Sequence, residues 1–252
     1  MTAYAGKVGE PLTGLPPLYA KGQGGLLDVV LAPDFASSKK IYFSYSEPAE
    51  GDASELNSTA VSFATLNGNK LENLSRVFSQ QPKINSGHHF GSRLVWAPDG
   101  TLFITLGDRY SEKDSAQTLD NHLGKVVRIN ADGSVPKDNP FINTAGALPE
   151  IWSIGHRNMQ GAAINPTSKV LWTGEHGPQG GDELNIDEAG KNYGWPVITY
   201  GENYGGGKIG EGTHKAGMEQ PVYKWVPSIA TAGFMFYTGD KFPQWKNNIL
   251  LA

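Results

Sequence analysis

The sequence predicts an all-β fold, and three observations point to a β-propeller. The 32 glycines and 16 prolines are spread along 252 residues, which suits many short strands and turns better than long helices. One pattern of strand, proline turn and strand recurs along the chain. Its period is too long for a solenoid repeat, but it fits blades of four antiparallel strands enlarged by loops.

The recurring pattern occupies three pairs of segments. These are residues 29–34 and 40–46, residues 94–100 and 101–108, and residues 162–166 and 169–175. The prolines of the three turns, Pro33, Pro98 and Pro166, are 65 and 68 residues apart, and a weaker fourth copy begins near residues 232–237. At this spacing the chain holds about four blades, near the low end of the 4 to 8 that propellers have. Residues 1–252 are therefore interpreted as a single propeller domain, complete or partial.

The segments between the copies read as the outer strands of the blades. Residues 60–65 precede Asn67-Gly68 and residues 124–130 precede Ala131-Asp132-Gly133, and both turns have the chemistry of hairpins. The second strand of each copy ends near an acid, Glu47, Asp108 or Glu175. Equivalent strand ends of a propeller lie on one face, so we expect polar groups distant in sequence to meet there.

Composition excludes several classes of function. The net charge is −4 without a run of Lys or Arg, so neither nucleic acid nor an anionic membrane is an expected partner. The absence of cysteine rules out disulfides, thiolate metal sites and cysteine nucleophiles. No window has the roughly 18 to 20 apolar residues needed to cross a bilayer. The first residues lack the apolar core of a secretion signal, so we expect a soluble chain without a signal peptide.

His89 and Gln23 stand in glycine-rich segments just before predicted strands. His89 has an unperturbed pKa suited to proton abstraction near neutrality, and its position allows it to face a cavity. A surface or metal-binding pair with His88 explains the same residues. Gln23 precedes the first strand as His89 precedes the second, although an exposed amide in a flexible loop is the simpler interpretation.

Arg157 and Asn158 follow the apolar stretch 151–154 and Gly155, in a place with little packing value. A guanidinium there could polarise a carbonyl group or hold an anion, because it presents a planar fork of donors. A structural ion pair of Arg157 is the alternative.

The loop at residues 174–183 packs four glycines and Pro178 close to Asp182 and Glu183. A backbone that turns this sharply can offer carbonyl oxygens beside carboxylates, as Ca²⁺ requires. A plain solvated turn has the same composition. The Tyr193 ring is expected to pack in the core, which leaves its carbonyl oxygen free for a cation.

Five motifs in order resemble the soluble PQQ-dependent aldose sugar dehydrogenases, relatives of soluble glucose dehydrogenase. They are residues 22–28, residues 89–94, residues 155–161, residues 175–178 with 182–183, and residues 191–196. The resemblance runs over nearly the whole chain. It implies a six-bladed propeller that holds pyrroloquinoline quinone (PQQ) across its axis, with Ca²⁺ between cofactor and protein. Members of this family extend well beyond Ala252, which implies a chain truncated at its C-terminus.

The resemblance also implies roles for individual residues. His89 is similar to the general base that takes the proton of the anomeric hydroxyl while hydride passes to the quinone, and Arg157 would stabilise the charge that develops there. Gln23, Arg157 and Asn158 match cofactor contacts. The main-chain oxygens of Gly177 and Pro178 match ligands of the Ca²⁺ beside the cofactor. A second, structural calcium site is implied for three residues, Glu183, Tyr193 and Glu219.

The implied activity is the oxidation of aldoses at C1 to lactones with PQQ and Ca²⁺ as cofactors. It requires an aldose substrate and an external electron acceptor, and the resemblance implies a monomer or homodimer in the periplasm or outside the cell. An alternative is a non-catalytic propeller that binds a sugar or protein partner without cofactor. A calcium-centred lactonase would need a cage of carboxylate and Asn side chains at the axis, for which the sequence shows no pattern.

Overall fold

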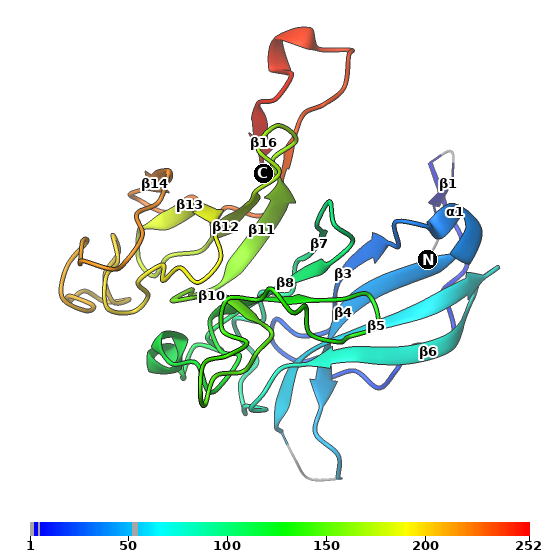
Figure 1. Cartoon of the computed structure of the whole chain (residues 1–252), viewed down its shortest axis with the longest axis horizontal. Coiled ribbons are helices and arrows are strands. Elements are labelled where there is room, and N and C mark those ends of the chain that lie inside the picture. The colour runs from blue at the N-terminus through cyan, green and yellow to red at the C-terminus, as the bar shows by residue number, and fades with distance from the viewer. Residues whose placement is uncertain (1–2, 5, 52–54) are drawn as a thin grey trace.

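Almost all of the regular secondary structure of the protein is antiparallel β-sheet (Figure 1). The computed structural model describes residues 3–4, 6–51 and 55–252. Helical structure is confined to short turns, and none in this described part of the chain has the length and apolar character of a membrane-spanning helix.

The first sheet has the strand order β3-β4-β5-β6, so each strand pairs with the next along the chain. Its strands are β3 (Leu26–Leu31), β4 (Lys40–Pro48), β5 (Asn57–Asn67) and β6 (Lys70–Ser79). One helical turn, α1 (Phe35–Ser38), joins β3 to β4, and a small hairpin of β1 (Ala3–Tyr4) and β2 (Lys7–Val8) precedes the sheet. This is the antiparallel order expected of a propeller blade.

Two further sheets repeat this order. The second consists of β7 (Leu94–Trp96), β8 (Leu102–Leu106), β9 (Lys125–Ile129) and β10 (Ile151–Ile154), with a 3₁₀ turn, η1 (Lys113–Gln117), between β8 and β9. The third consists of β11 (Met159–Ile164), β12 (Leu171–Glu175), β13 (Asp182–Asp187) and β14 (Tyr223–Trp225). The predicted strand pairs around Pro33, Pro98 and Pro166 are therefore confirmed.

The chain ends in a two-stranded hairpin of β15 (Phe234–Phe236) and β16 (Ile249–Leu251), with the 3₁₀ turn η2 (Pro243–Trp245) between them. The described chain thus forms three complete blades and two strands of a fourth, in agreement with the estimate of about four blades from the spacing. The weaker fourth copy predicted near residues 232–237 corresponds to β15, and a long loop, residues 188–222, separates β13 from β14.

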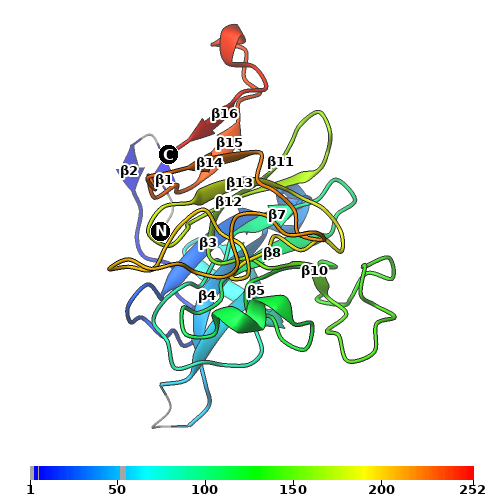
Figure 2. The same cartoon turned by 90° about the vertical axis from the view of Figure 1, so that its left-hand side faces the viewer.

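The sheets follow one another in a fan, with the first strand of each sheet on its inner side. β7 contacts both β3 and β11, and β11 also contacts β15. Figure 2 shows the fan from the side, with the β15–β16 hairpin projecting from it. This is the blade arrangement of a β-propeller, as predicted.

The core lies between the faces of neighbouring sheets, because side chains alternate along each strand. In β4, Tyr42 packs towards the second sheet, whereas Ile41 and Phe43 pack on the opposite face beneath the N-terminal segment. In β8, Ile104 faces the first sheet and Phe103 faces the third. Each such buried side chain stabilises the fold by about 1.5–3 kcal/mol before its entropic cost. The sheets are therefore firmly packed against one another, and the positions of their strand ends are fixed.

Two of the three acidic strand ends meet on one face, as expected. The Asp108 N–H donates to the Arg157 carbonyl (2.8 Å), and the Arg157 N–H donates to Oε2 of Glu175 (2.8 Å). Glu47 does not join them. Its carboxylate forms ion pairs with Lys83 and with Arg76 on β6, so it stays with the first sheet.

Candidate functional site

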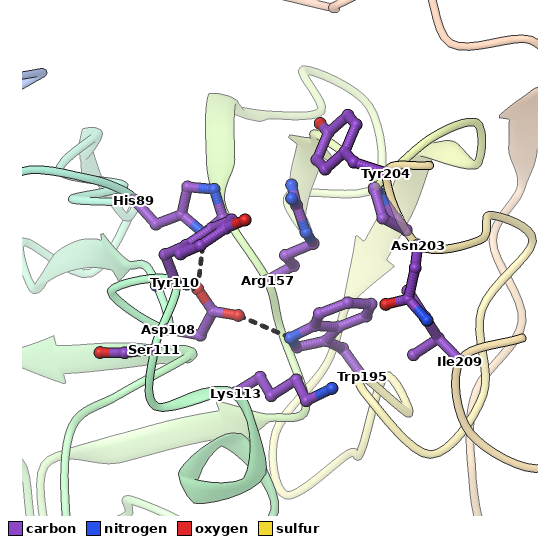
Figure 3. Close-up of a pocket in the computed structure, with 11 residues that line it drawn as sticks. His89, Asp108, Tyr110, Ser111, Lys113, Arg157, Trp195, Asn203, Tyr204 and Ile209 are labelled. Carbon is purple, nitrogen blue, oxygen red and sulfur yellow. Dashed lines mark hydrogen bonds and ion pairs between the residues drawn. The ribbon is translucent and has the colours of Figure 1, made fainter. Parts of the chain in front are cut away.

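A cavity of about 270 Å³ opens where the second and third sheets meet. Figure 3 shows that the side chains around it come from loops that follow several different strands. The lining residues are His89, Asp108, Tyr110, Ser111, Lys113, Arg157, Pro178, Trp195, Asn203, Tyr204 and Ile209. The structure therefore brings the two predicted catalytic residues, His89 and Arg157, to one cavity.

The His89 ring is held from behind by Asp108. Nδ1 of His89 lies 2.6 Å from Oδ1 of Asp108, and the same carboxylate accepts the Tyr110 N–H (2.8 Å) and Nε1–H of Trp195 (2.7 Å). A carboxylate that accepts from these partners places the His89 proton on Nδ1. Nε2 is then the free acceptor, on the side of the ring away from Asp108 (Figure 3).

Burial keeps the His89 imidazole neutral. His89 as a whole is 6% exposed to solvent. Desolvation lowers the pKa of His89 below its usual value and outweighs the hydrogen bond and charge of Asp108, while the nearby Arg157 charge lowers it further. At neutral pH the ring is therefore in the form that accepts a proton. The alternative interpretation of His89 as part of a histidine pair on the surface is wrong, because the residue is buried.

The backbone around His89 is tightly constrained. His89 has φ +50°, a left-handed conformation that residues with a Cβ seldom adopt. A Cβ at Gly107 would lie 2.0 Å from the His89 carbonyl oxygen, so only glycine permits this approach of the two loops. The His89 N–H donates to Oε1 of Gln23 (2.8 Å). Gln23 thus contacts the His89 backbone, and it does not line the cavity.

Arg157 presents a guanidinium without an ion pair. Nη1 donates to the His176 carbonyl (3.0 Å), and the guanidinium carbon lies 5.4 Å from the centre of the Trp195 ring. Among the described residues, no carboxylate lies within ion-pair distance of it, so the alternative of a structural ion pair is not supported. A positive charge at the cavity wall can bind an anionic or polarised group there.

Asn158 lies behind the cavity. It is 3% exposed, and its Oδ1 accepts the Gly91 N–H (3.2 Å) and Nε2–H of Gln160 (3.0 Å). It therefore ties the start of β11 to the loop that follows His89. Its predicted contact with a cofactor stays a prediction.

A second, smaller cavity of about 10 Å³ adjoins the first and shares Arg157, Pro178 and Trp195 with it. This is about the space of one water molecule. Gly177, Glu183 and Tyr193, which are predicted calcium ligands, also line it. Four predicted ligands therefore gather beside the larger cavity.

The oxygen atoms at this smaller cavity suit a hard cation. Among the described residues, no hydrogen bond reaches the carbonyl oxygens of Gly177, Pro178 or Tyr193. A Cβ at Gly177 would lie 2.3 Å from the carbonyl oxygen of Gly180, so the turn requires glycine. Desolvation and the neighbouring Glu175 carboxylate raise the pKa of Glu183 to about 8. Unpaired carbonyl oxygens beside an acid are ligands that Ca²⁺ accepts.

This donor set depends on main-chain atoms. Within the described ranges, no group of three or more His, Asp or Glu side chains is arranged to hold a metal. Glu219, the remaining predicted ligand, pairs with Lys191 (2.9 Å), is 38% exposed and lines neither cavity. The structure thus brings Glu183 and Tyr193 to one cavity, and the Glu219 N–H donates to the carbonyl oxygen of the residue before Tyr193 (2.8 Å).

A buried charge network supports Arg157 from the third sheet. His156 is fully buried, with Nε2 3.3 Å from Oδ2 of Asp187 and Nδ1 3.5 Å from Oε1 of Glu175. Burial opposes the imidazolium charge, but these two carboxylates outweigh it and raise the pKa of His156 to about 9. Its ring stacks on Tyr193 at 4.7 Å. The network holds the carboxylate that binds the Arg157 N–H.

Sequence reasoning expected Asp108 on the face of the site but gave no role to it or to Trp195. Asp108 follows the second strand of its frame at the position equivalent to Glu175, and that equivalence was the available signal. Trp195 lies within the motif at residues 191–196, but nothing local indicates that its indole reaches Asp108, 87 residues earlier. Tyr110 and Lys113 also line the cavity; Tyr110 lies in a loop and Lys113 begins η1, and neither belongs to a recognisable pattern.

Comparison with known proteins agrees with this architecture. The family model described as Glucose / Sorbosone dehydrogenase matches residues 1–252. The chain is 51% identical over 253 residues to aldose sugar dehydrogenase YliI of Escherichia coli K12, covering 98% of this chain and 67% of that protein. It therefore spans about two thirds of the length of this relative.

Solved structures show the same likeness. The apo form of the soluble aldose sugar dehydrogenase from Escherichia coli superposes with a TM-score of 0.93 at 50% identity, covering 98% of this chain and 72% of that chain. The PQQ-bound form of aldose sugar dehydrogenase from Streptomyces coelicolor superposes with a TM-score of 0.70 at 30% identity, covering 88% and 60%.

Proposed function

Because the chain belongs to the glucose/sorbosone dehydrogenase family, we propose that it acts in the PQQ- and calcium-dependent oxidation of an aldose at C1 to the lactone. The observation that carries this proposal is the buried pair of His89 and Asp108 at the cavity that Arg157 also lines. A neutral imidazole with a free Nε2 is the group that such an oxidation needs.

His89 is the general base. Oxidation removes a hydride from C1 and a proton from the anomeric oxygen, and Nε2 accepts that proton. Asp108 keeps Nδ1 protonated and stabilises the imidazolium that forms. When bound, PQQ supplies the acceptor of the hydride and its two electrons, which the external electron acceptor later removes.

The cofactor seat is assigned to the cavity wall at Arg157. The unpaired guanidinium stabilises negative charge at this wall, and the Trp195 indole beside it offers a flat apolar surface. Gln23 and Asn158 support the seat through the backbone of the loops that they bind. The donors present therefore fit an anionic, planar group.

The calcium ligands are assigned to the smaller cavity. Gly177 and Pro178 would hold the ion beside the cofactor through their carbonyl oxygens, where Ca²⁺ acts as a Lewis acid. Glu183, Tyr193 and Glu219 would belong to a second, structural ion. The proposed substrate is an aldose, and the protein is proposed to be a monomer or homodimer in the periplasm. The single-domain organisation of residues 1–252 stays a prediction.

Reconstitution tests the proposal. The 252-residue chain is loaded with PQQ and Ca²⁺, and aldose oxidation is followed with an artificial electron acceptor. We expect turnover, a change in PQQ absorbance on binding, and loss of turnover in His89→Gln without loss of PQQ binding. Absence of any change in PQQ absorbance would instead favour the non-catalytic binding module. Turnover that persists in a folded His89→Gln variant would contradict the role of the base.

A further inference from the structure

Arg109 is a fully buried arginine next to the proposed catalytic pair, and the reaction does not use it. It is 0% exposed and directly follows Asp108. In the described part of the chain, no carboxylate forms an ion pair with it. Burial accordingly lowers the pKa of Arg109 to about 10. A buried charge without a counter-charge is costly, so the arginine at this position needs a physical reason.

The Arg109 side chain donates to three main-chain oxygens and one side-chain oxygen on two segments. Nε donates to the His88 carbonyl (2.9 Å), Nη1 donates to the Asn57 carbonyl (3.1 Å), and Nη2 donates to Oδ1 of Asn57 (2.7 Å). Nη2 also donates to the Ser86 carbonyl. The guanidinium carbon lies 3.9 Å from the centre of the Phe90 ring. Only a guanidinium has a rigid fork of donors that reaches all four oxygens at once.

The residues that Arg109 holds surround His89 in the sequence. Ser86 and His88 precede it and Phe90 follows it, so the fork and the aromatic contact fix the loop on both sides of the base. This loop needs fixing, because His89 has φ +50°. A residue with a Cβ keeps that conformation only where its surroundings impose it.

Asp108 and Arg109 therefore act on the same loop from adjacent positions. The Asp108 carboxylate holds the imidazole ring, whereas the Arg109 guanidinium holds the backbone that carries it. We infer that Arg109 is a positioning residue that sets the His89 imidazole against Asp108 and the cavity. This inference rests on the proposed function, because it assigns Arg109 a part in the same reaction.

A purely structural role is the competing explanation. Arg109 also joins the end of β8 to the start of β5 through Asn57, so its loss would weaken the contact between the first two sheets. A structural strut would lower stability without a specific effect on turnover. Arg128 provides a matched control, since it is also a buried arginine (5% exposed) and lies on β9, the strand that pairs with β8. Two of its partners, Asp99 and Thr101, are at the opposite end of β8 from Asp108.

The test compares Arg109→Gln and Arg109→Lys with Arg128→Gln. In the cofactor-free chain, we expect the His89 amide hydrogen to exchange at least about tenfold faster in Arg109→Gln, with an intermediate rate in Arg109→Lys. With PQQ and Ca²⁺ bound, we expect kcat in Arg109→Gln to fall about 100-fold, because misplacement of a reacting group has effects of this size. KM and PQQ affinity should stay within about threefold of wild type. Arg128→Gln should lower the melting temperature and leave both readouts unchanged.

The outcomes separate the two proposals. A wild-type chain that binds no PQQ contradicts the proposed function, while the exchange measurement still decides whether Arg109 holds the His89 loop. An active wild type with unchanged kcat in folded Arg109→Gln overturns the inference, as does a kcat loss matched by Arg128→Gln. If Arg109→Gln does not fold, Arg109→Lys decides. Failure of both variants to fold would show that Arg109 has a purely structural role and would also overturn the inference.

Discussion

Replacement of Asp108 by Asn should abolish turnover while the fold survives. All three partners of the carboxylate are donors: Nδ1–H of His89 (2.6 Å), the Tyr110 N–H (2.8 Å) and Nε1–H of Trp195 (2.7 Å). An amide has one accepting end, so its NH₂ group must face a donor on one side. Turned towards His89, the NH₂ group donates to Nδ1 and moves the ring proton to Nε2, so that the accepting atom of the base carries a proton. Turned towards Trp195, it leaves the proton on Nδ1. In both orientations the negative charge that stabilises the imidazolium is lost.

The expected loss in kcat is about 10³- to 10⁴-fold, which corresponds to about 4–5.5 kcal/mol of transition-state stabilisation. The assay is steady-state aldose oxidation with PQQ, Ca²⁺ and an artificial acceptor, and a PQQ absorbance titration confirms that the site is still loaded. Trp195→Phe is the control. It removes a single hydrogen bond to Asp108 and keeps the bond to His89, so the loss should be about tenfold or less. An Asp108→Asn variant that binds PQQ and keeps kcat within tenfold of wild type would refute the reasoning.

Three further predictions concern pH and calcium. Because burial lowers the pKa of His89, kcat should rise with pH through a midpoint below about 6.5 and be level at neutrality, as a pH–rate profile would show. The pKa of His156 is raised to about 9, so its contribution to stability, about 3 kcal/mol, is fully present below about pH 6.5 and is lost as pH rises through about 9. Urea unfolding at pH 6 and pH 10 in calcium-free buffer checks this: between the two pH values His156→Gln should lose about 3 kcal/mol less stability than the wild type, and the change that remains belongs to other groups such as Glu183. Gly177→Ala should abolish the rise in melting temperature that Ca²⁺ gives the wild type, because the new Cβ would lie 2.3 Å from the Gly180 carbonyl oxygen. An equal rise in both proteins would contradict the calcium assignment.

The parts of this structure that the sequence predicts are those encoded locally. The strands around Pro33, Pro98 and Pro166 were predictable because alternation and turn residues act within a few positions. The spacing of these copies also predicted about four blades, and the structure has three complete blades and two strands of the next.

The site was predictable only where a residue type suggests its own chemistry. His89 and Arg157 carry functional side chains, and both line the cavity. Their supports depend on which loops cross: Arg109 acts on carbonyl oxygens 21 and 23 residues earlier, and no local pattern encodes that contact. Glu219 was assigned only through the family resemblance, and its role as a calcium ligand stays a prediction; its carboxylate pairs with Lys191 in this structure.

The geometry of the site depends on how closely the second and third sheets pack. The Asp108 N–H donates to the Arg157 carbonyl across the junction, and the Arg157 N–H donates to Glu175 on β12. A displacement of one sheet against the other would therefore lengthen this chain of hydrogen bonds and separate Arg157 from His89 as well. Because His89 and Arg157 must stay within about 0.5 Å of their working positions, a core substitution such as Met159→Ala between these sheets should lower kcat as well as stability. In this fold the packing between blades is thus part of the catalytic geometry.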